Sequence, residues 1–72
     1  MSTNANMQIV VNGETRPAAD GQTIEELLAA LQIDAARVAV ELDRRIVKPK
    51  DWAATRLHDG AQLEIVQFVG GG

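Results

Sequence analysis

The sequence has 72 residues, 46% hydrophobic and 24% charged. It therefore predicts one small globular domain that buries about 60% of the surface its unfolded chain exposes. A net charge of -3 argues against nucleic acid as a partner, because nucleic-acid-binding domains carry a basic face. The absence of cysteine excludes a disulfide scaffold, a thiolate metal site, a cysteine nucleophile and a bound persulfide. No segment has the length of a membrane span and the start lacks the features of a signal peptide, so we expect a soluble, cytoplasmic protein.

The chain begins with a polar segment and a predicted β-hairpin. Residues 1–6 are small and polar, and we interpret them as a flexible N-terminal arm. Alternating apolar residues from Met7 to Val11 predict a strand, and Asn12-Gly13 predicts a two-residue hairpin turn. Residues 14–19 then form the second strand. Pro17 confines that strand to a sheet edge, because proline cannot donate a ladder hydrogen bond.

A helix is predicted next, from residue 23 onward. Thr23-Ile24-Glu25-Glu26 matches a capping box, in which the first and last residues exchange hydrogen bonds at the helix N-terminus. The apolar residues that follow have the i, i+3, i+4, i+7 spacing of one helix face, and they are Ile24, Leu27, Leu28 and Leu31. Glu25 and Glu26 suit the positive end of the helix dipole, which we favour over a catalytic carboxylate pair.

Two short strands and a helical turn are expected after the helix. Val38, Val40 and Leu42 alternate with more polar residues and predict a third strand. The charged run 43–45 predicts a turn into a short fourth strand at 46–47. Pro49 permits a single helical turn, because its missing N–H costs nothing at a helix start. We expect Trp52 to anchor this connection.

The final strand is predicted over residues 62–69, after the turn signal Asp59-Gly60. Both of its faces carry apolar side chains, so the strand is central in the sheet or its outer face meets a partner. We interpret Val66, Phe68 and Val69 as partner-binding residues, with packing in the core as the alternative. His58 is the single histidine and has no cysteine or clustered carboxylate beside it in sequence, so we expect a solvated surface residue.

The sequence ends in Gly70-Gly71-Gly72, which we interpret as a flexible tail behind a folded domain of residues 7–69. Glycine has no Cβ, so three in a row form a thin, pliant segment that reaches about 10 Å when extended. Such a tail is able to enter a narrow channel in another protein. We expect the carboxylate of Gly72 to be the functional group. The alternative interpretation is a frayed chain end without a role.

A hairpin, one helix and further strands predict an α+β fold with one main helix on one face of a mixed sheet. Residues 7–72 resemble the ubiquitin-like β-grasp sulfur carriers, and in particular the ThiS family of thiamine biosynthesis. The most specific part of the resemblance is Asp59-Gly60 with the run Glu64-Ile65-Val66-Gln67-Phe68-Val69-Gly70-Gly71-Gly72. The less specific parts are Met7 to Glu14, Gly21 to Leu28 and Val40 to Trp52. The resemblance implies the strand order 2-1-5-3-4.

The resemblance also implies that the chain is a carrier and a substrate, and not an enzyme. A ThiF-like enzyme would adenylate the Gly72 carboxylate with ATP, and a sulfur donor fed by a cysteine desulfurase would convert it to a thiocarboxylate. A ThiG-like thiazole synthase would then accept the sulfur, with Gly70 and Gly71 entering the partner active sites. The chain has neither a GxGxxG fingerprint nor a P-loop, so we expect it to bind no cofactor itself and to leave ATP and magnesium to the activating partner.

Three other functions stay open at this point. A MoaD-like carrier would donate sulfur to a molybdopterin precursor. A protein modifier would become attached to lysines through Gly72. A β-grasp binding module would have no use for the tail. A ferredoxin version of this fold is excluded, because its iron–sulfur cluster needs cysteine ligands.

Overall fold

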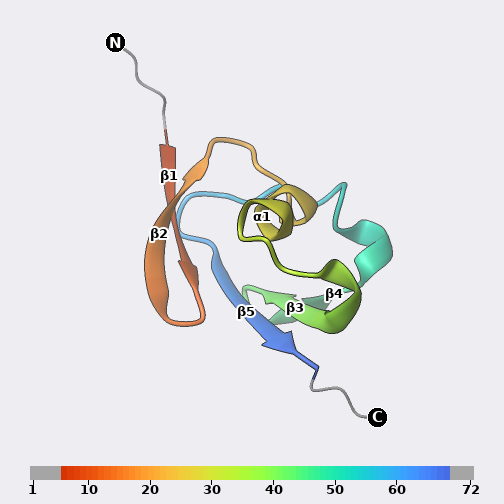
Figure 1. Ribbon diagram of the computed structural model, residues 1–72. Helices are drawn as coiled ribbons and strands as arrows, with labels where there is room; N and C mark the ends of the chain where they lie inside the picture. Colours follow the sequence, from red (N-terminus) through yellow and green to blue (C-terminus); the bar gives the residue numbers. More distant parts are fainter. Residues whose placement is uncertain (1–5, 69–72) are drawn as a thin grey trace.

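The computed structural model describes residues 6–68, and its first element is a β-hairpin (Figure 1). Strand β1 (Asn6–Val11) pairs antiparallel with β2 (Glu14–Ala19). Positive φ values of 51° at Asn12 and 85° at Gly13 confirm the predicted two-residue turn. Asn6 was expected in the N-terminal arm, but it belongs to β1, because Ala19 at the end of β2 pairs with it. The rest of the arm, residues 1–5, lies outside the described residues.

The five strands form one sheet in the order β2-β1-β5-β3-β4. Strand β5 (Gln62–Gln67) is central, parallel to β1 on one side and antiparallel to β3 (Val38–Leu42) on the other. Strand β4 (Arg45–Val47) is one edge, and β2, with Pro17, is the other. The predicted order, the edge position of the second strand and the central position of the last strand are all confirmed. This is the ubiquitin-like β-grasp arrangement.

The helix α1 (Ile24–Ala30) begins at the predicted capping box. The Glu26 N–H donates to Thr23 Oγ1 at 3.1 Å, and the Thr23 N–H donates to Glu26 Oε1 at 3.0 Å. The helix ends early, because Gln32 takes a left-handed conformation with φ of 59°. The Ile33 N–H then donates a hydrogen bond to the Leu28 carbonyl at 3.0 Å, which completes a Schellman motif. In residues 6–68 no helix is long and apolar enough to cross a membrane.

The hydrophobic core lies between α1 and one face of the sheet (Figure 1). Its largest fully buried side chains come from β1, α1, β3 and β5, and they are Ile9, Ile24, Leu28, Val40 and Leu63. Each strand contributes alternate residues to this face, as the period of two requires. Leu31 and Ile33 pack half-buried at the core margin, where the short helix leaves part of the sheet uncovered.

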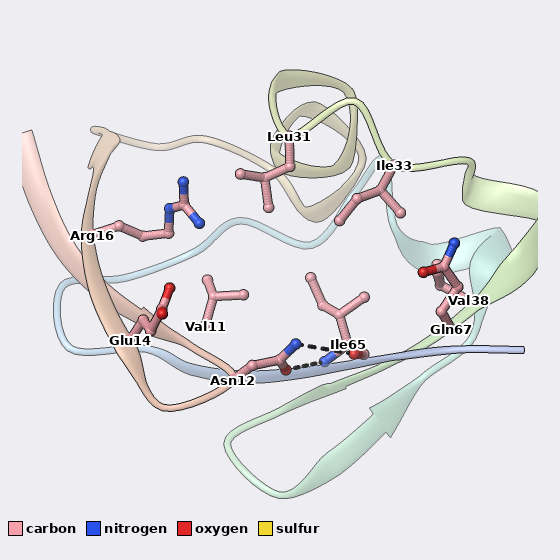
Figure 2. Close-up of a pocket in the computed structure, with 9 residues that line it drawn as sticks. All are labelled: Val11, Asn12, Glu14, Arg16, Leu31, Ile33, Val38, Ile65 and Gln67. Atoms are coloured by element: carbon pink, nitrogen blue, oxygen red, sulfur yellow. Dashed lines mark hydrogen bonds between the residues drawn. The ribbon is translucent and has the colours of Figure 1, made fainter.

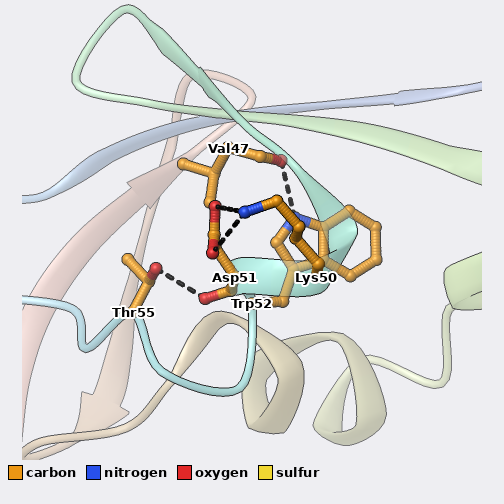
Figure 3. A network of polar contacts seen from close by, with 5 residues as sticks. All are labelled: Val47, Lys50, Asp51, Trp52 and Thr55. Carbon is orange, nitrogen blue, oxygen red and sulfur yellow. Dashed lines mark hydrogen bonds and ion pairs between the residues drawn. The ribbon is translucent and has the colours of Figure 1, made fainter.

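The connection from β4 back toward the helix runs through a 3-10 turn (Pro49–Asp51) and the indole of Trp52. Figure 3 shows the Trp52 Nε1–H donating to the Val47 carbonyl, at 2.8 Å. Trp52 is buried, so the prediction that it anchors this connection is confirmed. The Thr55 hydroxyl donates to the Asp51 carbonyl at 2.7 Å in the same network.

The turn between β3 and β4 is tighter than predicted. Asp43 and Arg44 both have positive φ, 51° and 72°, and form a two-residue turn, so Arg45 belongs to β4. Neither residue is a glycine, which is why the sequence indicated a longer charged turn. A further 3-10 turn (Ala35–Arg37) leads into β3, with the Asp34 side chain as its cap.

Candidate functional site

The candidate site is the end of β5, from which the glycine tail continues. The strand ends at Gln67, two residues before the predicted end at Val69. One further hydrogen bond, from the Phe68 N–H to the Arg37 carbonyl at 2.7 Å, holds the chain against the residue that precedes β3. We call Gln67 and Phe68 the tail base. Val69, Gly70, Gly71 and Gly72, all predicted site residues, lie outside the described residues.

An apolar patch lies beside the tail base, on the sheet face away from α1. Its residues are Ile46, Val66 and Phe68, which are 74%, 57% and 55% exposed. They are the exposed large hydrophobic residues in the described part of the chain. Val66 lies opposite Ala39 on β3, and Ile46 lies opposite Glu41, so the patch extends over three neighbouring strands. We call this surface the outer patch.

The structure therefore places Val66 and Phe68 on the surface and not in the core. Sequence reasoning missed Ile46, because the alternation of Ile46 with Val47 puts the two side chains on opposite faces without showing which one faces outward. Val47 lies opposite the buried Val40, which turns Ile46 to the other face of the two-stranded edge. The assignment needs the pairing register, and the sequence alone does not give it.

A groove of about 310 Å³ adjoins the outer patch and shares Ile46 and Phe68 with it. It forms because β4 pairs with β3 only as far as Val40, and no other strand in the described part of the chain lies beside Val38 and Ala39 on that side. Its lining is almost entirely apolar and also includes Ala35, Ala36, Val40, Val47, Lys48, Pro49 and Trp52. The groove and the outer patch together form a continuous apolar surface next to Phe68.

A second cleft, of about 370 Å³, lies on the helix side of the sheet. Figure 2 shows its apolar side chains between α1 and the sheet, with Arg16 directed into the space from β2. The cleft reaches the tail base through Gln67, which lines its far end. Asn12 lines it as well, and the side-chain amide of Asn12 is hydrogen-bonded to the main chain of Ile65.

Two ionisable side chains with shifted pKa values, Asp43 and His58, lie at the other end of β5, near its start. His58 Nε2 donates to Asp43 Oδ2 at 2.7 Å, and the Asp43 Oδ1 accepts from the Gln62 N–H at 3.1 Å. The hydrogen bond from His58, with that from Gln62, lowers the pKa of Asp43. The hydrogen bond to Asp43, with a contact from Nδ1 to the Asp59 carbonyl, raises the pKa of His58. His58 is exposed, as expected, and it forms an ion pair with Asp43 when it is protonated.

The residues around the tail base resemble a protein-binding surface more than a catalytic centre. Residues 6–68 contain no group of three or more His, Cys, Asp or Glu side chains placed to hold a metal ion. The shifted acid–base pair of His58 and Asp43 is remote from the tail base along β5. The arrangement offers an anchored strand end flanked by exposed apolar side chains, immediately before the glycine run of the sequence.

Comparison with known proteins agrees with this geometry. Residues 9–72 match the model of the ThiS family. The sulfur carrier protein ThiS of Escherichia coli is 36% identical over 66 residues, which cover 92% of this chain and 100% of that protein. The crystal structure of the thiamine biosynthesis protein ThiS from Geobacter metallireducens superposes with a TM-score of 0.81 at 35% identity. That match covers 92% of this chain and 100% of the other.

A larger protein also contains a similar segment. The thiazole synthase of Paramagnetospirillum magneticum is 44% identical over 66 residues, which cover 92% of this chain. The chain spans about a fifth of the length of that synthase, because the match covers 20% of it. A domain similar to this chain therefore occurs within one polypeptide that is named for thiazole synthesis.

Proposed function

This chain belongs to the ThiS family, and from that premise we propose that it carries sulfur for formation of the thiazole ring of thiamine. In this proposal the carrying group is the α-carboxylate of Gly72. The observation that carries the proposal is the family match over residues 9–72, which includes the terminal glycines. The chain acts as a substrate of other enzymes, and it binds neither ATP nor magnesium itself.

The chemistry requires two steps at one carboxylate group. An α-carboxylate has a pKa of about 3.3–3.7, so at neutral pH it is an anion and a poor electrophile. A ThiF-like enzyme attaches it to the α-phosphorus of ATP, which releases pyrophosphate and leaves an acyl adenylate. Sulfur from a donor fed by a cysteine desulfurase, delivered at the oxidation level of sulfide, then displaces AMP. The product is a thiocarboxylate, which is itself a sulfur nucleophile.

The surroundings of the tail base support this proposal. An acyl adenylate is open to water, so the tail has to react inside an enclosed site on the activating enzyme. The four residues from Val69 to Gly72 span at most about 14 Å when extended. The entrance to such a site must therefore lie close to Phe68. We assign docking of the activating enzyme to the outer patch, because this patch includes Phe68 and its other residues, Ile46 and Val66, are exposed apolar residues as well.

The sulfur acceptor in the proposal is a ThiG-like thiazole synthase. The similarity of this chain to one segment of a thiazole synthase supports the assignment, because a related domain occurs in one polypeptide with that name. The same short tail has to serve both enzymes. The acceptor must therefore also contact the surface around the tail base, and we expect the two enzymes to bind one at a time.

The proposal is tested by the intact mass of the protein. The chain is incubated with the activating enzyme, ATP, magnesium, a cysteine desulfurase, cysteine and a reducing thiol, beside a chain that lacks Gly72. We expect exchange of one oxygen for one sulfur in the full chain only, placed at Gly72 by fragmentation. Absence of the exchange, with an active enzyme and a control carrier, would overturn the thiamine assignment. Higher-mass conjugates to other proteins would indicate a modifier instead.

A further inference from the structure

Strand β5 continues past the end of β1, and from there no strand within residues 6–68 pairs with its edge on that side. The β1–β5 ladder ends with the pair Val11↔Leu63, and the Asn12 N–H adds one more hydrogen bond to the Leu63 carbonyl at 2.9 Å. Alternate residues of a strand direct their N–H and C=O groups to the same side. Ile65 and Gln67 therefore direct theirs toward the side that β1 no longer covers. Side chains or water have to satisfy them.

The side chain of Asn12 takes the place of the missing strand at Ile65. The Ile65 N–H donates to Asn12 Oδ1 at 2.7 Å, and Asn12 Nδ2 donates to the Ile65 carbonyl at 3.2 Å. Figure 2 shows both hydrogen bonds at the floor of the helix-side cleft. The two residues are 53 positions apart in sequence. One side-chain amide thus forms both bonds that a paired strand residue would form, and we call it the Asn12 clasp.

Asparagine meets two requirements at this position. The hairpin turn needs a left-handed conformation there, with φ of 51°, which asparagine tolerates better than most residues. The clasp needs one acceptor and one donor on the same short side chain. Aspartate supplies the acceptor only, and glycine supplies the conformation only. The residue that forms the turn is therefore also the residue that holds the last central strand.

The clasp restrains the tail base from the hairpin side. On the other side, β3 and the Arg37 carbonyl hold the chain as far as Phe68. Ile65 precedes Phe68 by three residues, about 10 Å, so a rotation of about 10° at Ile65 would move Phe68 by nearly 2 Å. Displacements of about 1 Å at a reacting group are able to lower rates by about a hundredfold. The direction in which the tail leaves the sheet therefore depends on both restraints.

We propose that Asn12 is a positioning residue for the transfer chemistry, which it affects by fixing the end of β5 and hence the point where the tail begins. This inference rests on the proposed function. The clasp lies on the helix side of β5, whereas the outer patch lies on the opposite face. Loss of the clasp should consequently impair the chemical step more than docking. We therefore expect a lower kcat with little change in KM.

The test uses two substitutions of Asn12 in the full chain and one matched control. Asn12→Gly keeps the left-handed backbone and the main-chain bond to Leu63, and it removes both clasp bonds. Asn12→Asp retains only the acceptor for the Ile65 N–H. Gln32→Gly is the control, because Gln32 is also exposed, has φ of 59° and lies at the end of α1. Pyrophosphate release by the activating enzyme is measured against carrier concentration, under conditions where urea unfolding shows every variant folded.

For Asn12→Gly we expect kcat to fall about tenfold or more, with KM changed by less than about twofold because the outer patch is intact. Amide hydrogen exchange at Ile65 should become faster. Asn12→Asp should lie between this variant and the parent, and Gln32→Gly should match the parent. If glycine at position 12 prevents folding, the same split between kcat and KM is read from Asn12→Asp.

The outcomes separate the two proposals. A parent chain that releases no pyrophosphate overturns the proposed function and the positioning role with it. An active parent, with a kcat for Asn12→Gly equal to its own while exchange at Ile65 is faster, overturns the positioning role alone. A rise in KM with unchanged kcat also overturns it, because the clasp would then affect docking and not the placement of the tail.

Discussion

Truncation of Phe68 tests the docking surface most directly. Phenylalanine buries about 150–250 Å² when covered completely, and here 55% of the residue is exposed. Contact with the activating enzyme would thus remove about 110 Å² from water, a gain of almost 3 kcal/mol at about 25 cal/mol per Å². Alanine keeps part of this area, so Phe68→Ala should weaken binding by about 2 kcal/mol, which is about 30-fold.

The assay is the KM for the carrier in pyrophosphate release, supported by calorimetric titration of the two proteins. Gln62→Ala is the matched control, because Gln62 is exposed on the same face of β5 at its far end. Phe68 is also partly buried, and its loss should lower the free energy of unfolding by about 1 kcal/mol or somewhat more. Thr23→Ala controls for that loss, because it destabilises the helix start away from the outer patch.

A KM for Phe68→Ala within about threefold of the parent's, at a concentration of urea where both chains are folded, would refute the assignment of docking to the outer patch. A similar rise in KM for Thr23→Ala would also refute it, since the effect would then follow stability. A large rise confined to Phe68→Ala would support it.

Three further predictions concern the fold. Leu28→Ala should lower the free energy of unfolding by about 2–5 kcal/mol, because Leu28 is fully buried between α1 and the sheet; a loss below 1 kcal/mol in urea unfolding would contradict this packing. Thr23→Ala should cost about 1 kcal/mol by removing a capping bond, seen as a lower midpoint at an unchanged urea slope. Folding raises the pKa of His58 from 6.5, so its stabilisation is complete below pH 6.5 and is lost as the pH rises through the folded-state value. Folding lowers the pKa of Asp43 from 3.8, so that contribution is present above pH 3.8 and is lost as the pH falls through the lower folded-state value. Unfolding of His58→Gln at several pH values should therefore differ from the parent mainly between pH 3.8 and 6.5, and by a small amount because both side chains are exposed; a difference that grows above this range would contradict the pair.

Local signals in the sequence were sufficient for much of the fold. Asn12-Gly13 predicted the turn, Thr23 to Glu26 predicted the helix start, and Pro17 predicted the edge strand. Each of these signals acts through sterics or hydrogen bonds between residues that are near one another in sequence. Such effects persist in any tertiary context that allows the element to form. The glycine run 70–72 lies outside the described residues, and both its flexibility and its role stay predictions.

Other features were decided by tertiary structure alone. Ile46 is exposed because of the register in which β4 pairs with β3, and β5 ends at Gln67 because its ladder with β3 ends there. Gln32 and Arg44 take left-handed conformations although neither residue is a glycine. None of these is visible in the local sequence.

The Asn12 side chain shows most clearly where the sequence stops being sufficient. By itself the sequence determined that Asn12 occupies a turn, because that depends on its own backbone preference and on Gly13. Only the tertiary structure decided that the same side chain binds Ile65, 53 residues away. That contact exists because the parallel pairing of β1 with β5 brings the two residues together, and no property of either residue specifies its distant partner.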